Sequence, residues 1–101
     1  MITNSIDGFE GVDKLFLMEF SMPPDVNNSA QKDMPAIWLL NANIPRTAQY
    51  HSCSCWKTGC GEFDIVETLH SGSTYMKSTL HTNTPGGDSD FVVRPTTEMM
   101  K

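Results

Sequence analysis

Short runs of apolar residues, separated by clusters of Pro, Gly, Asn, Asp and Ser, set the pattern of this chain. Runs of this length that are rich in β-branched and aromatic residues are typical of β-strands. No segment shows apolar residues at the spacing of an amphipathic helix, except for the last few residues of the chain, which are too short a stretch to form one. The pattern predicts strands at residues 14–22 (KLFLMEFSM), 34–40 (MPAIWLL), 62–69 (EFDIVETL), 75–81 (YMKSTLH) and 91–93 (FVV).

The breaks between these runs favour an all-β fold with long loops. Pro23-Pro24-Asp25 ends the first run, and the sequences Ser71-Gly72-Ser73 and Thr84-Pro85-Gly86-Gly87-Asp88 predict turns. Residues 41–61 form a long irregular connection, and a connection of that length in a compact domain is usually functional or cross-linked. We expect a β-sandwich or jelly roll spanning residues 14–95, preceded by a polar lead-in at 1–13 and followed by a tail at 96–101.

Three acidic residues interrupt the most apolar part of the third predicted strand. Glu62, Asp64 and Glu67 stand there among the apolar residues Phe63, Ile65 and Val66. Burying three carboxyl groups together costs free energy unless the protein uses them. The acids therefore indicate a functional site, although an exposed strand edge with solvated acids is the simpler alternative.

The spacing of the acids predicts a local irregularity in the strand. Glu62 and Asp64 are two residues apart and share a face, whereas Glu67 is five residues after Glu62 and would face the other way. A β-bulge near Ile65 and Val66 would return Glu67 to the first face. The two glutamate carboxyls would then be about 5 Å apart, the separation of a retaining glycosidase rather than an inverting one.

Composition narrows the range of partners. The chain has 101 residues, 12 acidic against 7 basic side chains, and a formal net charge of −5. The basic residues are scattered, so nucleic acid and anionic membranes are unexpected partners. No apolar run is long enough to span a bilayer, and residues 1–11 lack the basic-then-apolar order of a signal peptide. A neutral carbohydrate is compatible with this balance, and no cofactor or metal is expected.

Three cysteines lie within eight residues, at Cys53, Cys55 and Cys60. This density is typical of an oxidising compartment and of a loop held by a disulfide, although an odd number leaves one thiol over. A metal site is the alternative, because His51 precedes the cysteines. The single compact cluster lacks the two separated knuckles of the usual zinc pattern.

Several motifs taken together resemble the core of glycoside hydrolase family 16. That family carries a P-A-x-W-L-L strand, an E-x-D-x-x-E strand and a T-L-H strand, in that order. A fungal branch of cell-wall proteins, the glucan endo-1,3-β-glucosidases, is more similar still. The matching stretches are 34–50 (MPAIWLLNANIPRTAQY), 53–65 (CSCWKTGCGEFDI) and 78–81 (STLH), within a resemblance that covers about residues 14–95.

The resemblance implies a concanavalin-like jelly roll and a role for each matching residue. Glu62 would be the nucleophile and Glu67 the general acid/base of a retaining endo-β-1,3-glucan hydrolase or transglycosidase, with Asp64 holding Glu62. The substrate would be β-glucan polysaccharide of the fungal cell wall, and the location extracellular. Trp38 and Trp56 could stack on a sugar, and His81 would lie near the cleft, although Trp38 also fits a core position and His81 a structural hydrogen bond.

The length of the chain sets a second expectation. A jelly roll of this family has about twice this length and more than a dozen strands, whereas five are predicted here. We therefore expect an incomplete domain, and its activity could be lost. A non-catalytic wall or carbohydrate-binding protein that keeps the strand architecture is the alternative function.

Overall fold

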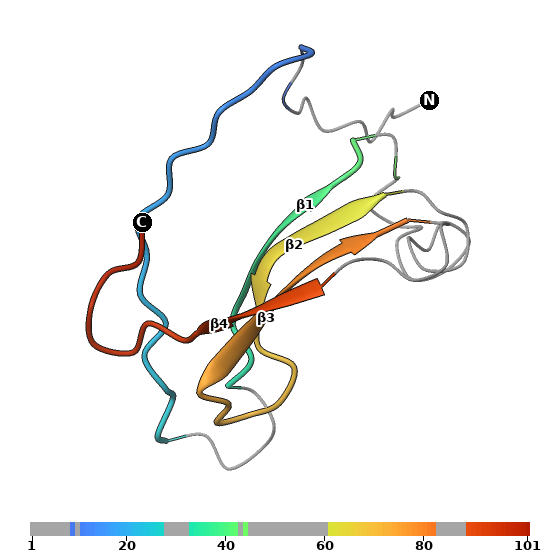
Figure 1. Cartoon of the computed structure of the whole chain (residues 1–101). Coiled ribbons are helices and arrows are strands. Elements are labelled where there is room, and N and C mark those ends of the chain that lie inside the picture. Colours follow the sequence, from blue (N-terminus) through green and yellow to red (C-terminus); the bar gives the residue numbers. More distant parts are fainter. Residues whose placement is uncertain (1–8, 10, 28–32, 43, 45–60, 83–88) are drawn as a thin grey trace, which may run out of the picture.

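The computed structural model describes residues 9, 11–27, 33–42, 44, 61–82 and 89–101. These residues form an all-β structure in which one antiparallel sheet has four strands in the order β1-β2-β3-β4 (Figure 1). The described part contains no helix, so no helix there could cross a membrane. The prediction of an all-β fold is confirmed.

The strands lie where the sequence pattern places them, with small differences at the ends. They are β1 at Ala36–Leu40, β2 at Glu62–Glu67, β3 at Tyr75–His81 and β4 at Ser89–Val93. The predicted turn at residues 71–73 is present: Ser73 N–H donates to the His70 carbonyl at 3.1 Å, and Gly72 has a φ of 76°. Glycine suits this position because a side chain is strained at positive φ. The predicted turn at 84–88 lies outside the described residues.

A β-bulge interrupts β2 at the predicted place. Asp64 pairs with Thr79 and Glu67 pairs with Lys77, so three steps on β2 match two steps on β3. The register against β1 shifts at the same level. The extra residue on β2 confirms the bulge inferred from the odd spacing of Glu62 and Glu67.

The hydrophobic core lies against one face of the sheet, which we call the core face. Val66 from β2 and Met76 from β3 are buried there against Met22, and Met76 is only 1 % exposed. Partly buried apolar residues complete the cluster: Phe20, Ile37, Val92 and Met100. Burying a side chain of this size contributes about 1.5–3 kcal/mol, so this small cluster is the main apolar support of the sheet.

The first predicted strand is wrong as a strand. Residues 14–22 alternate in exposure as a strand would, since Leu15 and Leu17 are 83 % and 88 % exposed and Met22 is buried. In the described structure the segment pairs through an isolated bridge between Phe20 and Met100 and one further backbone hydrogen bond, from Met22 N–H to the Pro95 carbonyl at 2.8 Å. Apolar alternation does not make a strand unless a neighbouring chain supplies the ladder hydrogen bonds.

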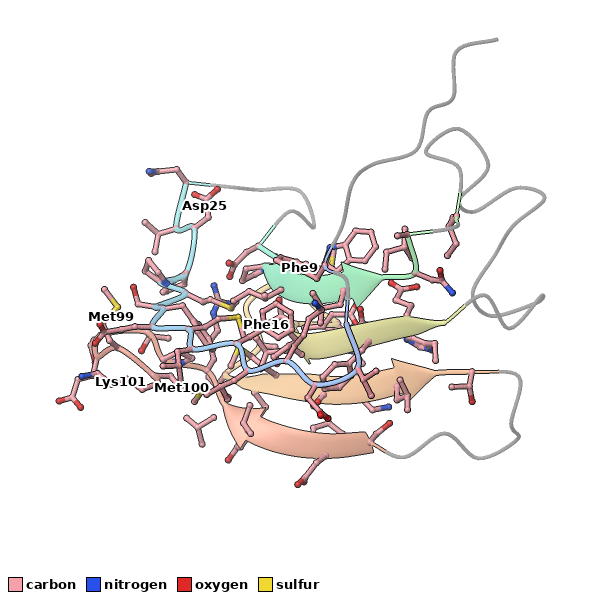
Figure 2. The ribbon with its side chains drawn as sticks, turned by 90° about the horizontal axis from the view of Figure 1, so that it is seen from above. Phe9, Phe16, Asp25, Met99, Met100 and Lys101 are labelled. Atoms are coloured by element: carbon pink, nitrogen blue, oxygen red, sulfur yellow. The ribbon has the colours of Figure 1, made fainter. Side chains whose placement is uncertain are left out.

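Extended segments at both ends of the chain meet beside the sheet. Figure 1 shows the C-terminus next to the N-terminal segment, and in Figure 2 Met99, Met100 and Lys101 gather at one end of the molecule. Phe20 and Met100 exchange two backbone hydrogen bonds, of 3.0 and 2.9 Å. Farther along the N-terminal segment, Phe9 and Phe16 pack edge to face with ring centroids 4.8 Å apart.

A buried ion pair fixes these segments to the sheet. Arg94 follows β4 and forms two hydrogen bonds to the Asp33 carboxylate, at 2.6 and 3.0 Å. Its guanidinium also donates to the carbonyls of Met22 and Pro23, at 2.6 and 3.0 Å. The Arg94 side chain is 1 % exposed and the Asp33 side chain 7 %. Hydrogen bonding to Arg94 lowers the pKa of Asp33 to about 2, so the carboxylate stays ionised.

Candidate active site

The bulge brings the three predicted carboxyl groups to the sheet face opposite the core. On β3, the residues that pair with Glu62, Asp64 and Glu67 are spaced two apart along the strand. Residues two apart share a face, so all three pairs project from the same side of the sheet. We call this side the acid face. The partners on β3 are, in the same order, His81, Thr79 and Lys77.

Local packing explains why the extra residue sits between Asp64 and Glu67. Ile65 and Val66 both lie opposite Ser78, and Val66 is held in the core at 6 % exposure. The shifted ladder moves the Asp64 carbonyl out of register, and the Ser78 hydroxyl donates to it at 3.3 Å. Directly after β2, Thr68 fixes the strand end, because its N–H and its hydroxyl each donate to the Pro35 carbonyl at 3.0 Å.

Asp64, the middle acid, is held by a histidine from the next strand. His81 Nε2 lies 2.8 Å from Asp64 Oδ2. The side chain of Asp64 is 7 % exposed and that of His81 is 22 % exposed. His81 is the register partner of Glu62, so this contact runs diagonally across the two strands. This partly buried hydrogen bond keeps the Asp64 carboxyl in one orientation between the two glutamates.

Glu67 differs electrostatically from an ordinary surface glutamate. Burial raises its pKa above the usual value of 4.5, and the negative charges of Asp64 and Glu62 add to the increase. The positive charges of His81 and Lys77 act in the opposite direction, but the balance is upward. A carboxyl whose pKa is raised by burial and neighbouring carboxylates keeps its proton at higher pH and can act as an acid.

The structure places only one of the two tryptophans that the sequence indicated as sugar-binding residues. Trp38 lies on the acid face as the β1 partner of Asp64 and is 39 % exposed, so a ring surface is accessible beside the acids. Trp56 and the cysteine cluster of Cys53, Cys55 and Cys60 lie outside the described residues. Among the described residues, no group of His, Cys, Asp and Glu side chains could hold a metal ion.

Sequence reasoning missed Lys77. This residue is the β3 partner of Glu67 and the positive charge nearest to it in register. Its position four residues before His81 in a predicted strand was the available signal, since the two must then share a face. Its pairing with Glu67 could not be predicted, because that depends on how the bulge shifts the register.

Comparison with known proteins places the chain in a family. The family model described as "Cell wall protein YJL171C/Tos1, C-terminal" matches residues 3–101. A Saccharomyces cerevisiae protein named "Probable circularly permuted 1,3-beta-glucanase TOS1" is 57 % identical over 97 residues, covering 93 % of this chain and 21 % of that protein. A Candida albicans protein of the same name is 50 % identical over 111 residues, covering 98 % of this chain and 24 % of that protein.

A third relative shows the same partial coverage. The Arthroderma benhamiae protein named "Probable circularly permuted 1,3-beta-glucanase" is 50 % identical over 101 residues, which cover 91 % of this chain and 23 % of that protein. The chain thus spans about a fifth to a quarter of the length of these relatives. No solved structure matches the chain.

Proposed function

The chain belongs to the cell wall protein family YJL171C/Tos1, C-terminal, and from this membership we propose that its acid face cleaves or transfers β-1,3-glucan. The relatives named as 1,3-beta-glucanases support the choice of substrate. Fungal cell-wall glucan, as a neutral polymer, is compatible with a chain of net charge −5. The reaction proposed is retaining endo-hydrolysis or transglycosylation.

The β2 bulge is the observation that carries the proposal. Without it, Glu67 would point to the core face, and Asp64 would be the only one of the other two acids on the face of Glu62. With it, the acid whose pKa is raised stands on the same face as Glu62 and Asp64. A retaining glycosidase needs one ionised carboxylate as nucleophile and one protonated carboxyl as general acid.

The proposed roles follow from these environments. The Glu62 carboxylate attacks the anomeric carbon and forms a glycosyl ester, while Glu67 gives its proton to the departing glycosidic oxygen. Glu67, now ionised, then takes a proton from water or from a sugar hydroxyl, whose oxygen attacks the anomeric carbon and releases Glu62. Asp64, fixed by His81, orients Glu62 and its charge raises the pKa of Glu67.

We further propose that the sheet is part of a glycoside hydrolase family 16-like jelly roll. The order of the three motif strands, now seen as the neighbours β1, β2 and β3, supports this proposal. The remaining strands would lie in the rest of a longer protein such as the relatives. Trp38, exposed on the acid face beside Asp64, would contact a sugar ring.

The test compares three glutamate-to-glutamine variants on a linear β-1,3-glucan. The assay measures the release of reducing ends, and a circular dichroism spectrum of each sample checks that the variant is folded. The release of reducing ends is expected to vanish in Glu62→Gln. Glu67→Gln should lose about 10²–10⁴-fold, the usual contribution of a general acid. Glu98→Gln, which changes an exposed residue in the C-terminal segment, is the matched control and should keep full activity.

Two outcomes would change the proposal. Full activity in Glu62→Gln removes Glu62 from the nucleophile role. Glucan binding by the folded wild-type chain without any release of reducing ends would instead support a non-catalytic carbohydrate-binding protein. The anomeric configuration of the first product, followed by nuclear magnetic resonance, separates a retaining from an inverting reaction.

A further inference from the structure

A second group of residues lies on the acid face, beyond Glu67. Lys77 pairs with Glu67 on one side and with Phe91 on the other, so these three residues form a row across β2, β3 and β4. Tyr75 and Val93 pair in the next row of the same two strands. Because side chains alternate along a strand, all of them point to the acid face. We call Tyr75, Lys77, Phe91 and Val93 the β3–β4 patch.

Three of the four residues of the β3–β4 patch have aromatic or apolar side chains that are exposed, whereas Met76 and Val92, between them on the core face, belong to the hydrophobic core. Tyr75, Phe91 and Val93 are 57 %, 65 % and 63 % exposed, whereas Met76 on the core face is 1 % exposed. Lys77 Nζ lies over the Phe91 ring, 5.8 Å from its centre, so a hydrogen-bond donor stands directly beside the aromatic surface.

The chemistry of the patch fits a pyranose ring. An aromatic side chain offers a flat apolar surface to the C–H groups of a sugar, and an ammonium group donates to its hydroxyls. Glu62, Asp64 and Glu67 on the same face would repel an anionic ligand, so a neutral sugar is favoured over a phosphate or an acidic peptide.

The position of the patch relates it to the proposed reaction. Phe91 is two strands from Glu67, about 10 Å at the usual strand spacing. A sugar ring is about 5 Å across on ordinary bond lengths, so the patch lies roughly two sugar units from the linkage that Glu67 would protonate. A glucan chain that crosses the strands from Glu67 would pass over Lys77 and reach Phe91.

We propose that the β3–β4 patch is a distal subsite for a glucose unit of the β-1,3-glucan chain, with Phe91 as its platform. The identity of the ligand rests on the proposed function, but the position of the subsite rests on the register. The subsite would make the protein bind long glucan chains more tightly than short ones.

The experiment measures binding by calorimetry, in the Glu62→Gln background so that the ligand is not cleaved. The ligands are β-1,3-linked glucose disaccharide and hexasaccharide. Phe91→Ala should weaken hexasaccharide binding about 2- to 12-fold, the range that an aromatic contact provides, and leave disaccharide binding unchanged. Phe91→Trp should restore the affinity. Phe9→Ala removes another exposed phenylalanine, 72 % exposed on the N-terminal segment, and is the control that should change nothing.

Each remaining outcome overturns the inference. Equal hexasaccharide affinity for Phe91→Ala and its parent would do so, as would equal affinity of the parent for the short and the long ligand. A dimer that Phe91→Ala disrupts, without any effect on glucan affinity, would assign the patch to a second copy of the chain. The proposed catalysis is tested independently of the subsite, because it is measured as reducing ends released by the wild-type chain.

Discussion

The hydrogen bond between His81 and Asp64 makes the sharpest prediction, because one substitution tests both the stability and the electrostatics of the site. His81→Leu removes the donor and leaves an Asp64 side chain that is only 7 % exposed without its 2.8 Å contact. His81→Gln keeps an N–H donor of similar reach and serves as the matched control.

The structure sets the magnitude of the effect. A hydrogen bond to a charged group contributes about 1.5–3 kcal/mol. The His81 side chain is 22 % exposed, so water replaces part of the lost contact and the lower half of the range applies. We expect His81→Leu to lower the free energy of unfolding by about 1.5–2 kcal/mol and His81→Gln by less than about 0.5 kcal/mol.

Urea unfolding at neutral pH, followed by circular dichroism and tryptophan fluorescence, measures this difference. At about 1–3 kcal/mol per molar urea, the midpoint of His81→Leu should fall by roughly 0.5–2 M. Both variants remove the imidazole charge, which lowers the pKa of Glu67 in the wild type. A nuclear magnetic resonance titration should therefore show a higher Glu67 pKa in both. A His81→Leu variant that unfolds like the wild type, or a His81→Gln variant as destabilised as His81→Leu, would contradict a stabilising hydrogen bond between His81 and Asp64.

Three further predictions concern the core and the two perturbed acids. Met76→Ala should lower the free energy of unfolding by about 2–5 kcal/mol, because Met76 lies in the core. Val93→Ala, on the exposed acid face, should lower it by less than about 1 kcal/mol. Equal losses in the two variants would contradict the placement of the core. Because the pKa of Asp33 is lowered from 3.8 to about 2, its pairing with Arg94 stabilises the fold fully above pH 4. That stability is lost as pH falls through about 2, so the stability difference between wild type and Asp33→Asn should shrink over this interval in acid urea titrations; a constant difference would argue against the pairing. Because the pKa of Glu67 is raised, its ionisation opposes folding, and the wild type should lose stability relative to Glu67→Gln as pH rises from 4.5 through the raised value; parallel pH profiles would refute the shift.

The sequence by itself predicted the four strands of the sheet and the bulge in β2. The segments now seen as β1, β2, β3 and β4 were all located from their apolar patterns, and β3 was predicted with its observed limits. The bulge was also predictable, because Glu62 and Glu67 are an odd number of residues apart and a strand has a period of two. These features depend on local periodicity, which a sequence displays directly.

Only the tertiary structure decided which residues meet across the chain. Residues 14–22 carry a strand pattern but form no strand, because a strand also needs a partner backbone in register. The pairing of Arg94 with Asp33 joins residues 61 positions apart, and the contact of His81 with Asp64 depends on a register that the bulge shifts by one. Periodicity fixes the face on which a side chain projects, whereas its neighbour on the next strand is fixed by packing of the whole sheet. The chemical character of Glu67, an acid with a raised pKa, arises from that packing, because its burial and its position on the same face as Asp64 and Glu62 exist only once the chain is folded.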